Sequence, residues 1–227
     1  MLNSLGKKIG GSLAGLMHGI IMKRLGHNVR ILEQNLSSTR TDHAAGIGTG
    51  PQGLQFFMEN DRYPRPYSFA CPGFQFLDRA SNVKRVIDLS LNLSSWNVLY
   101  YRLRANFDSL QSEYCPEPIN PAATDGKAVY DLGKQATNAS YNDGFVTVEY
   151  NNLEVAGGGT IHADLVIVAD GQNSTIRRKF MPDLEYPYSG YVAWRGTVPE
   201  RDVSIETRKL FDKRFNVFAM PQGYIVG

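Results

Sequence analysis

The stretch Gly10-Gly11-Ser12-Leu13-Ala14-Gly15 lies near the start of the chain and constrains the fold more than any other segment. It is a variant of the GxGxxG pattern, with a serine at the position of the second glycine. In that pattern Gly10 would allow a tight turn from strand to helix, and Ser12 would let the backbone approach a pyrophosphate. Gly15 would let the helix pack closely against the strand. An anion would bind at the helix N-terminus, where free N–H groups and the helix dipole favour negative charge. The pattern predicts a Rossmann-like strand, turn and helix.

The residues that follow the turn agree with this prediction. Residues 12–25 carry apolar side chains at helical spacing, and Gly26 provides a stop signal. Residues 28–33 then read as a short strand that ends at Glu33, 18 residues after Gly15. An acidic residue at that place is expected to bind a ribose hydroxyl, and it favours an unphosphorylated ribose, as in FAD or NAD.

Two other interpretations of the same stretch remain open. A glycine-rich helix start can bind no ligand at all. A serine nucleophile elbow, Gly-x-Ser-x-Gly, would need a glycine where Ala14 stands, and only His162 lies far enough along the chain to serve as its base.

The rest of the chain alternates between strand and helix patterns. Residues 95–110 have the spacing of a helix, and residues 165–169 form a continuous apolar run typical of a strand buried on both faces. The antiparallel strand patterns lie at 74–89 and 128–155, the second with a hairpin turn at 142–144, and further strand-like pieces lie at 190–198, 215–221 and 224–227. The predicted fold class is therefore α/β (α+β), a Rossmann-like nucleotide-binding layer interleaved with an antiparallel sheet.

Composition excludes several classes of protein. Hydrophobic residues make up 42% of the 227 residues and charged residues 20%, as in ordinary globular chains. A formal net charge of +2 does not indicate nucleic acid or an anionic membrane surface as a partner. Cys71 and Cys115 form no CxxC pair and suggest free thiols in a reducing compartment, the cytoplasm. The four histidines, at 18, 27, 43 and 162, show no metal-binding spacing.

A second motif lies between Ala163 and Arg177, which reads ADLVIVADGQNSTIR. It combines an apolar strand, a turn at Asp170-Gly171 and the start of a helix that Asn173 or Ser174 is placed to cap. Together, the two motifs resemble the flavin-dependent aromatic monooxygenases of the p-hydroxybenzoate hydroxylase type, in which ADLVIxADGxxSxxR is characteristic. Residues 95–104, SWNVLYYRLR, look like the family's helix that ends in a flavin-contacting arginine. Residues 190–196, GYVAWRG, resemble a substrate-sheet segment of the subgroup near 2,6-dihydroxypyridine 3-monooxygenase.

The resemblance implies FAD as cofactor, NAD(P)H as electron donor, and hydroxylation of an aromatic or heteroaromatic small molecule by O₂ through a flavin C4a-hydroperoxide. For Arg104 the alternative is a solvated helix arginine. Tyr191, Trp194 and Arg195 are candidates to face the substrate, although packing in a sheet core is the favoured interpretation for Trp194. The implied cofactor-binding residues are Gly10, Ser12, Leu13, Ala14, Gly15, Glu33, Gln34, Arg104, Asp170 and Gly171.

The chain departs from the family's pattern in two places. Residues 1–8, MLNSLGKK, predict a poor central strand before the glycines, and no Gly-Asp dipeptide occurs to match the family's later FAD-binding motif. We therefore expect a truncated chain, with an FAD-binding portion at 1–185, an antiparallel insertion around 60–90, and the start of a substrate-binding sheet domain at 186–227. Three alternatives are another FAD oxidoreductase of the same fold, an inactive remnant of such an enzyme, and an isolated NAD-binding Rossmann domain. The antiparallel insertions argue against the last.

Overall fold

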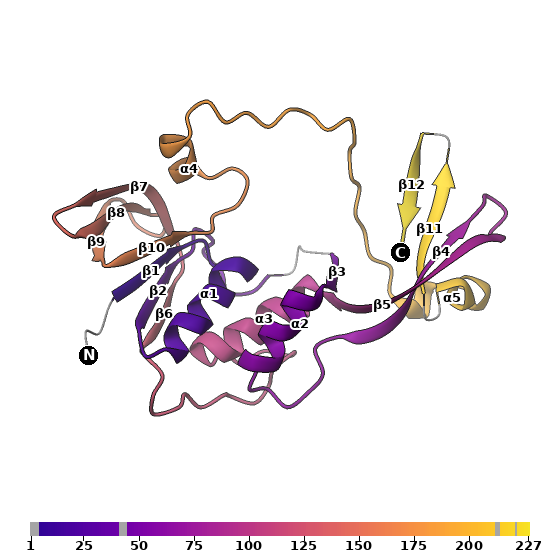
Figure 1. Cartoon of the computed structure of the whole chain (residues 1–227), viewed down its shortest axis with the longest axis horizontal. Helices are drawn as coiled ribbons and strands as arrows, with labels where there is room; N and C mark the ends of the chain where they lie inside the picture. Colours follow the sequence, from indigo (N-terminus) through magenta and orange to yellow (C-terminus); the bar gives the residue numbers. More distant parts are fainter. Residues whose placement is uncertain (1–4, 41–44, 212–213, 221) are drawn as a thin grey trace. The chain divides into compact units, whose positions relative to one another are not determined.

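The computed structural model describes residues 5–40, 45–211, 214–220 and 222–227 (Figure 1). The chain divides into two compact units. Unit 1 comprises Met1–Asp42, Phe56–Pro64 and Asn97–Tyr191, and unit 2 comprises His43–Gln55, Arg65–Trp96 and Val192–Gly227. Residues 1–4, part of the predicted poor strand, and His43 lie outside the described residues.

A four-stranded parallel sheet forms the centre of unit 1, in the order β10-β1-β2-β6. Its strands are β1 (Leu5–Ile9), β2 (Asn28–Leu32), β6 (Ala128–Asp131) and β10 (Leu165–Val168). The expectation of a poor first strand is wrong for the described part, because β1 is hydrogen-bonded on both sides, with Ile9 opposite Leu32 and Val168. Backbone pairing with two neighbours holds this strand in place, and Ile9 is buried.

The strand β10 is less buried than the apolar run predicts. It stands at one end of the strand order, and Leu165 and Val168 are 46% and 40% exposed. Burial on both faces requires cover on both faces, and a strand at the sheet edge lacks part of that cover. The strand itself is confirmed, and its burial on both faces is not.

Two helices pack together beside this sheet. The helix α1 (Leu13–Arg24) confirms the prediction for residues 12–25 and buries Leu16 and Ile20 completely. The helix α3 (Trp96–Asp108) confirms the prediction for 95–110. The Lys23 ammonium group donates hydrogen bonds to the carbonyl oxygens of Asn106, at 3.1 Å, and Phe107, at 2.8 Å. These bonds tie the C-terminal turn of α1 to the C-terminal turn of α3 (Figure 1).

The remainder of unit 1 is a three-stranded antiparallel sheet and a short helix. The strands β7 (Lys134–Asn142), β8 (Phe145–Asn152) and β9 (Gly158–Ala163) follow one another as neighbours. Asn142 pairs with Phe145 across the turn, which confirms the predicted hairpin, and both turn residues have positive φ (Asp143 50°, Gly144 88°). The helix α4 (Thr175–Phe180) is capped by Ser174, one of the two predicted caps, whose Oγ accepts from Arg177 N at 2.9 Å.

Unit 2 contains a five-stranded sheet in the order β12-β11-β4-β5-β3. Its strands are β3 (Gly46–Thr49), β4 (Phe69–Leu77), β5 (Val83–Ser95), β11 (Phe215–Met220) and β12 (Gly223–Val226), accompanied by α5 (Ile205–Phe211) and the 3₁₀ turn η1 (Glu200–Asp202). The helix α2 (Pro51–Asn60) follows β3 along the chain. The long pair β4–β5 shares this sheet with the C-terminal strands, because Phe215–Phe218 of β11 pair in parallel with Phe74–Leu77 of β4.

Two predictions for the C-terminal part are wrong. Residues 190–198 form no strand, and Trp194 is 92% exposed rather than packed in a sheet core. Apolar residues alone do not make a strand without a partner to pair with, and no ladder includes this segment in the described chain. The structure confirms the interleaved α/β fold class, with parallel and antiparallel sheets built from alternating parts of the sequence.

No helix among the described residues is long and apolar enough to cross a membrane. Cys71 and Cys115 are both buried.

Candidate nucleotide-binding site

The two sequence motifs meet at the first glycine. Gly10 has φ of +95°, and a β-carbon there would lie 2.4 Å from the carbonyl oxygen of Ala169, immediately before Asp170. Gly10 N–H also donates to the carbonyl oxygen of Leu32 at 3.0 Å. Only glycine meets these steric and dihedral demands at low cost. The turn after β1 is thereby fixed against the ends of both β10 and β2.

The last glycine of the motif has the close-packing role that its position predicts. A β-carbon on Gly15 would stand 1.9 Å from the carbonyl oxygen of Gly10. The first turn of α1 therefore lies directly on the turn that precedes it.

The N-terminus of α1 is suited to an anion. Ser12 is the N-cap residue, its side chain makes no capping hydrogen bond within the described structure, and the first turn carries no acidic residue. The N–H groups of Leu13 and Ala14 belong to that first turn, where a helix leaves backbone donors without intrahelical partners. A phosphate would satisfy these donors and interact favourably with the helix dipole. Binding of a cofactor by Ser12, Leu13 and Ala14 stays a prediction.

Glu33 lies beside the same turn, as its place at the end of the second strand predicts. Its carboxylate is buried, and Oε2 accepts from Gly11 N–H at 2.8 Å. Oε1 accepts from Asn35 N–H at 2.9 Å and pairs with Arg40 Nη2 at 3.1 Å. The predicted ribose-binding carboxylate is therefore anchored to the turn, while the neighbouring Gln34 is exposed.

Arg104 is buried rather than solvated, so the interpretation as a surface helix arginine is wrong. Its Nε and Nη2 donate to the two carboxylate oxygens of Asp108 at 3.0 Å and 2.8 Å, and Nη1 donates to Tyr100 Oη at 2.9 Å. The guanidinium carbon lies 3.6 Å from the centre of the Tyr130 ring. Burial alone would lower the pKa of Arg104, but the bonded carboxylate of Asp108 outweighs it and raises the pKa. Arg104 is a permanently charged group inside unit 1, and its contact with flavin stays a prediction.

Sequence reasoning missed Tyr130 and Arg40. Tyr130 Oη donates to the Gly11 carbonyl oxygen at 2.7 Å, and a β-carbon on Gly11 would lie 2.1 Å from that hydroxyl. The position of Tyr130 offered one indication, because β6 is the strand next to β2 and ligands of such sheets bind beyond the strands' carboxyl ends.

Arg40 adds a buried cation beside Glu33. Its side chain is 11% exposed, and its backbone N–H donates to Tyr101 Oη at 2.9 Å. Its Nε is buried without a hydrogen-bond partner in the described structure. Burial alone would lower the pKa of Arg40, but the Glu33 carboxylate outweighs it and raises the pKa. The turn thus has a positive charge with a spare donor at its edge.

The remaining predicted residues lie on the turn after β10 or farther along the chain. Gly171 has φ of +83° and open space around it, which suits a turn that borders a ligand. Asp170 is half-buried beside it. Tyr191 and Trp194 are 71% and 92% exposed, and Arg195 is exposed as well.

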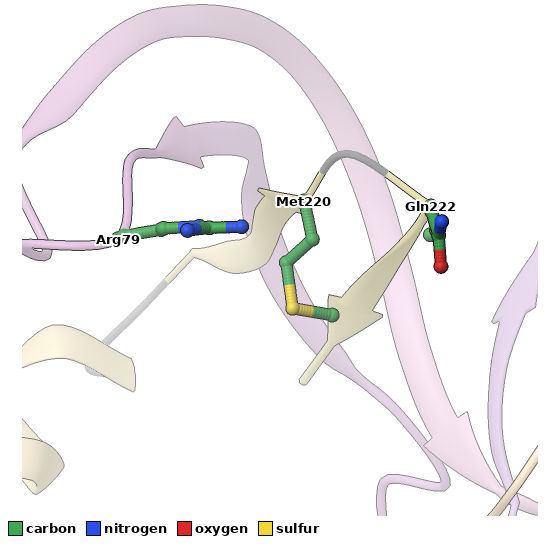
Figure 2. Close-up of a pocket in the computed structure, with 4 residues that line it drawn as sticks. Arg79, Met220 and Gln222 are labelled. Atoms are coloured by element: carbon green, nitrogen blue, oxygen red, sulfur yellow. The ribbon is translucent and has the colours of Figure 1, made fainter.

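A surface hollow of about 310 Å³ lies in unit 2, between the loop that follows β4 and the turn between β11 and β12 (Figure 2). Arg79, Met220, Gln222 and Gly223 line it. None of the predicted cofactor-binding residues contributes to it, so we assign it no part in the site.

Comparison with known proteins supports the resemblance. A family model described as FAD binding domain-like matches residues 188–227. The chain is 21% identical to 2,6-dihydroxypyridine 3-monooxygenase of Paenarthrobacter nicotinovorans over 96% of its length and 49% of that protein's. It is 26% identical to 6-hydroxynicotinate 3-monooxygenase of Bordetella bronchiseptica over 84% of its length and 47% of that protein's.

The solved structure of 2,6-dihydroxypyridine-3-hydroxylase from Arthrobacter nicotinovorans matches with a TM-score of 0.78 at 19% identity, over 99% of this chain and 51% of that one. The chain thus spans about half the length of these relatives. The flavin-dependent monooxygenase PieE, solved in complex with FAD and substrate, matches with a TM-score of 0.59 at 17% identity, over 78% of this chain and 32% of that one. The sequence-based prediction of FAD as cofactor agrees with the family model. The predicted resemblance is confirmed: over nearly its whole length, the chain has the fold of 2,6-dihydroxypyridine-3-hydroxylase and is similar in sequence to curated 3-monooxygenases.

Proposed function

We propose that this chain binds FAD at the Gly10–Gly15 turn and forms part of an NAD(P)H-dependent monooxygenase. The substrate class that we propose is a small aromatic ring, in particular a hydroxylated heteroaromatic ring such as a hydroxypyridine. Three of the relatives that match best are named as 3-monooxygenases of dihydroxypyridine or hydroxynicotinate, which supports this choice.

One observation carries the proposal. The steric contact of Gly10 with Ala169 brings the glycine turn and the Asp170-Gly171 turn to one edge of the parallel sheet. In sheets of this kind the ligand binds beyond the carboxyl ends of the strands, which is where both turns lie.

The residues at the turn fit the charges of FAD. The first-turn N–H groups of α1 would bind the pyrophosphate, and the Glu33 carboxylate would accept a hydrogen bond from a ribose hydroxyl. Arg40 would neutralise phosphate charge through the Nε donor that has no partner in the described structure. Bound FAD supplies electron transfer from NAD(P)H and activation of O₂, while the protein supplies binding, orientation and exclusion of water.

We also propose a separate role for each of the two units. Unit 1 carries the turn and would hold the cofactor, and unit 2 would form the beginning of a substrate-binding sheet. The two cysteines of the chain are buried and form no CxxC pair, which fits a reducing compartment, and we propose the cytoplasm.

The first test is the visible absorption spectrum of the purified 227-residue chain after incubation with FAD and gel filtration. We expect a retained flavin spectrum near one FAD per chain. NAD(P)H oxidation and O₂ consumption would then be followed with hydroxypyridines and phenols, and the hydroxylated product quantified.

Product formed in step with O₂ consumption would support the proposed reaction. Retained FAD with NAD(P)H oxidation and no hydroxylated product would favour another FAD oxidoreductase of this fold. A folded chain that leaves the column colourless would overturn the proposal for this chain and favour the inactive remnant.

A further inference from the structure

A series of hydrogen bonds through three side chains connects α3 to the glycine turn. Arg104 Nη1 donates to Tyr100 Oη at 2.9 Å, and Tyr100 Oη lies 3.3 Å from Tyr130 Oη. Tyr130 Oη donates to the carbonyl oxygen of Gly11 at 2.7 Å. The contacts cross the fold, because Gly11 and Tyr130 are 119 residues apart in sequence.

The donor-to-acceptor direction of these hydrogen bonds is fixed by the groups at the two ends of the series, Arg104 and Gly11. The guanidinium group of Arg104 can only donate, and the carbonyl oxygen of Gly11 can only accept. The Tyr130 hydroxyl has one proton and donates it to the carbonyl oxygen of Gly11. The Tyr100 hydroxyl must therefore be the donor in its hydrogen bond with Tyr130. Each hydroxyl therefore accepts at least one hydrogen bond and donates one, an arrangement in which successive bonds polarise and strengthen each other.

The Gly11 peptide groups are held on both sides as a result. Glu33 Oε2 accepts the Gly11 N–H at 2.8 Å, while Tyr130 binds the Gly11 carbonyl oxygen. The carbonyl of Gly11 and the N–H of Ser12 belong to the same peptide plane. A hydrogen bond to this carbonyl therefore sets the direction in which the Ser12 N–H points at the start of α1.

We propose that Tyr130 and Arg104 are positioning residues, which orient the Gly11–Ser12 peptide for the pyrophosphate of FAD without touching the cofactor. This inference rests on the proposed FAD site. It assigns Arg104 a role through Tyr100 and Tyr130, in place of a direct contact with flavin.

The surroundings of Arg104 agree with this role. Its side chain is 5% exposed and is held by Asp108 at two points, so little of it is open to a ligand. Burial, with the neighbouring Tyr100, raises the pKa of the Tyr130 hydroxyl, so this hydroxyl remains a donor throughout the pH range of ordinary assays.

The test compares Tyr130→Phe, Tyr100→Phe and the double variant with the unmodified chain. Tyr130→Phe removes the bond to Gly11 and keeps the ring beneath Arg104. We expect the Kd for FAD and for ADP to rise about 3- to 10-fold, the range that corresponds to one lost hydrogen bond. Because the two hydroxyls act in series, Tyr100→Phe should have a smaller effect and should add little to Tyr130→Phe in the double variant.

Tyr63→Phe is the matched control. Tyr63 is a buried tyrosine of unit 1 whose ring lies 4.8 Å from the guanidinium carbon of Arg102, and its hydroxyl accepts from the Glu117 backbone N–H at 3.3 Å. Tyr63→Phe also removes one hydrogen bond between a tyrosine hydroxyl and the backbone, but this bond is no part of the network that reaches Gly11. We expect an unchanged Kd for FAD in this variant, whatever its effect on the melting temperature.

Amide hydrogen exchange of the chain without FAD gives an independent readout. In Tyr130→Phe the protection of the Gly11 N–H, which is bonded to Glu33, should fall about 3- to 10-fold relative to residues of β8, which a general loosening would affect equally. Unchanged protection and unchanged Kd, or equal loss of affinity in Tyr63→Phe, would overturn the positioning role. If the unmodified chain binds no FAD, the proposed function fails, and the exchange data still decide whether Tyr130 orients this peptide.

Discussion

The α-carbon of Gly15 lies so close to Gly10 that a β-carbon would stand 1.9 Å from the Gly10 carbonyl oxygen. The obstructing atom belongs to the backbone and cannot turn away as a side chain could. The helix α1 and the turn before it must therefore separate if residue 15 carries any side chain.

Gly15→Ala is expected to lower the free energy of unfolding by about 1–3 kcal/mol, the usual cost of overpacking, and to abolish FAD retention. Urea unfolding of the chain would measure the first effect, and gel filtration with FAD the second. Gly53→Ala in α2 is the matched control. A β-carbon at Gly53 meets only the Thr49 side chain at 3.7 Å, so the better helix propensity of alanine should raise stability by about 0.5–1 kcal/mol. Equal stability of Gly15→Ala and the unmodified chain would contradict the steric interpretation.

Lys23 is expected to contribute strongly to the stability of unit 1. Its ammonium group binds two carbonyl oxygens at the end of α3 and lies 3.8 Å from the buried carboxylate of Asp125. Lys23→Met should cost about 2–4 kcal/mol, because it leaves those acceptors unpaired. Thermal and urea unfolding would measure the loss. Lys84→Met, which breaks an exposed pair with Asp78 at 3.0 Å, should change stability by less than about 1 kcal/mol.

Asp125 predicts a loss of stability in acid. Burial alone would raise the pKa of this carboxyl, but its bonds with Arg62, at 2.8 and 3.2 Å, and Ala122 N–H, at 3.1 Å, outweigh burial and lower the pKa below 3.8. A carboxyl whose pKa is lower in the folded state stabilises the fold at every pH above the pKa that it has in the unfolded chain. That contribution disappears as the pH falls through the pKa of the folded state.

We therefore expect the stability of the unmodified chain to fall more steeply below pH 3.8 than that of Asp125→Asn. Urea unfolding across pH 2.5 to 6 (roughly the window in which carboxyls titrate) would measure both slopes. Parallel curves for the two proteins would rule out a native-state pKa shift at Asp125.

Glu33→Gln tests the ribose-binding role of the buried carboxylate. The amide keeps the shape and one acceptor, but it loses the charge that binds Arg40 and Gly11 N–H. We expect the Kd for FAD to rise about 10-fold or more, as for loss of a hydrogen bond to a charged group. Glu154→Gln, whose side chain is 54% exposed and pairs with Lys134 at 3.7 Å, serves as the control and should leave the Kd unchanged. Fluorescence quenching of FAD would provide both values.

Local sequence patterns predicted the parts of the fold that depend on local sterics. Gly10, the hairpin at Asp143-Gly144 and the Ser174 cap express dihedral or capping preferences of single residues, and Gly15 expresses the close approach of a helix to the turn before it. Glu33, directly after β2, could also be predicted from the sequence, because its distance from the glycine turn is set by the length of one helix and one strand.

The tertiary contacts could not be predicted in the same way. Nothing in the sequence around Tyr130 indicates that its hydroxyl reaches Gly11, or that Arg104 lies over its ring. The strand β1 looked too polar for the centre of a sheet, yet its two neighbours supply the pairing that its composition does not indicate. The exposure of Trp194 also follows from the absence of a strand partner among the described residues rather than from hydrophobicity.

The contact between Gly11 and Tyr130 has an evolutionary consequence. Because a β-carbon at position 11 would lie 2.1 Å from the tyrosine hydroxyl, the two positions cannot mutate independently. Orthologues that carry a side chain at position 11 should have a smaller residue at position 130, because the ring carbons of Tyr130 obstruct that side chain as well, and the pair should covary despite its wide separation in the gene. Such lineages would have reached the change through a compensating substitution at Tyr130 first, since a smaller residue there makes room before the new side chain arrives.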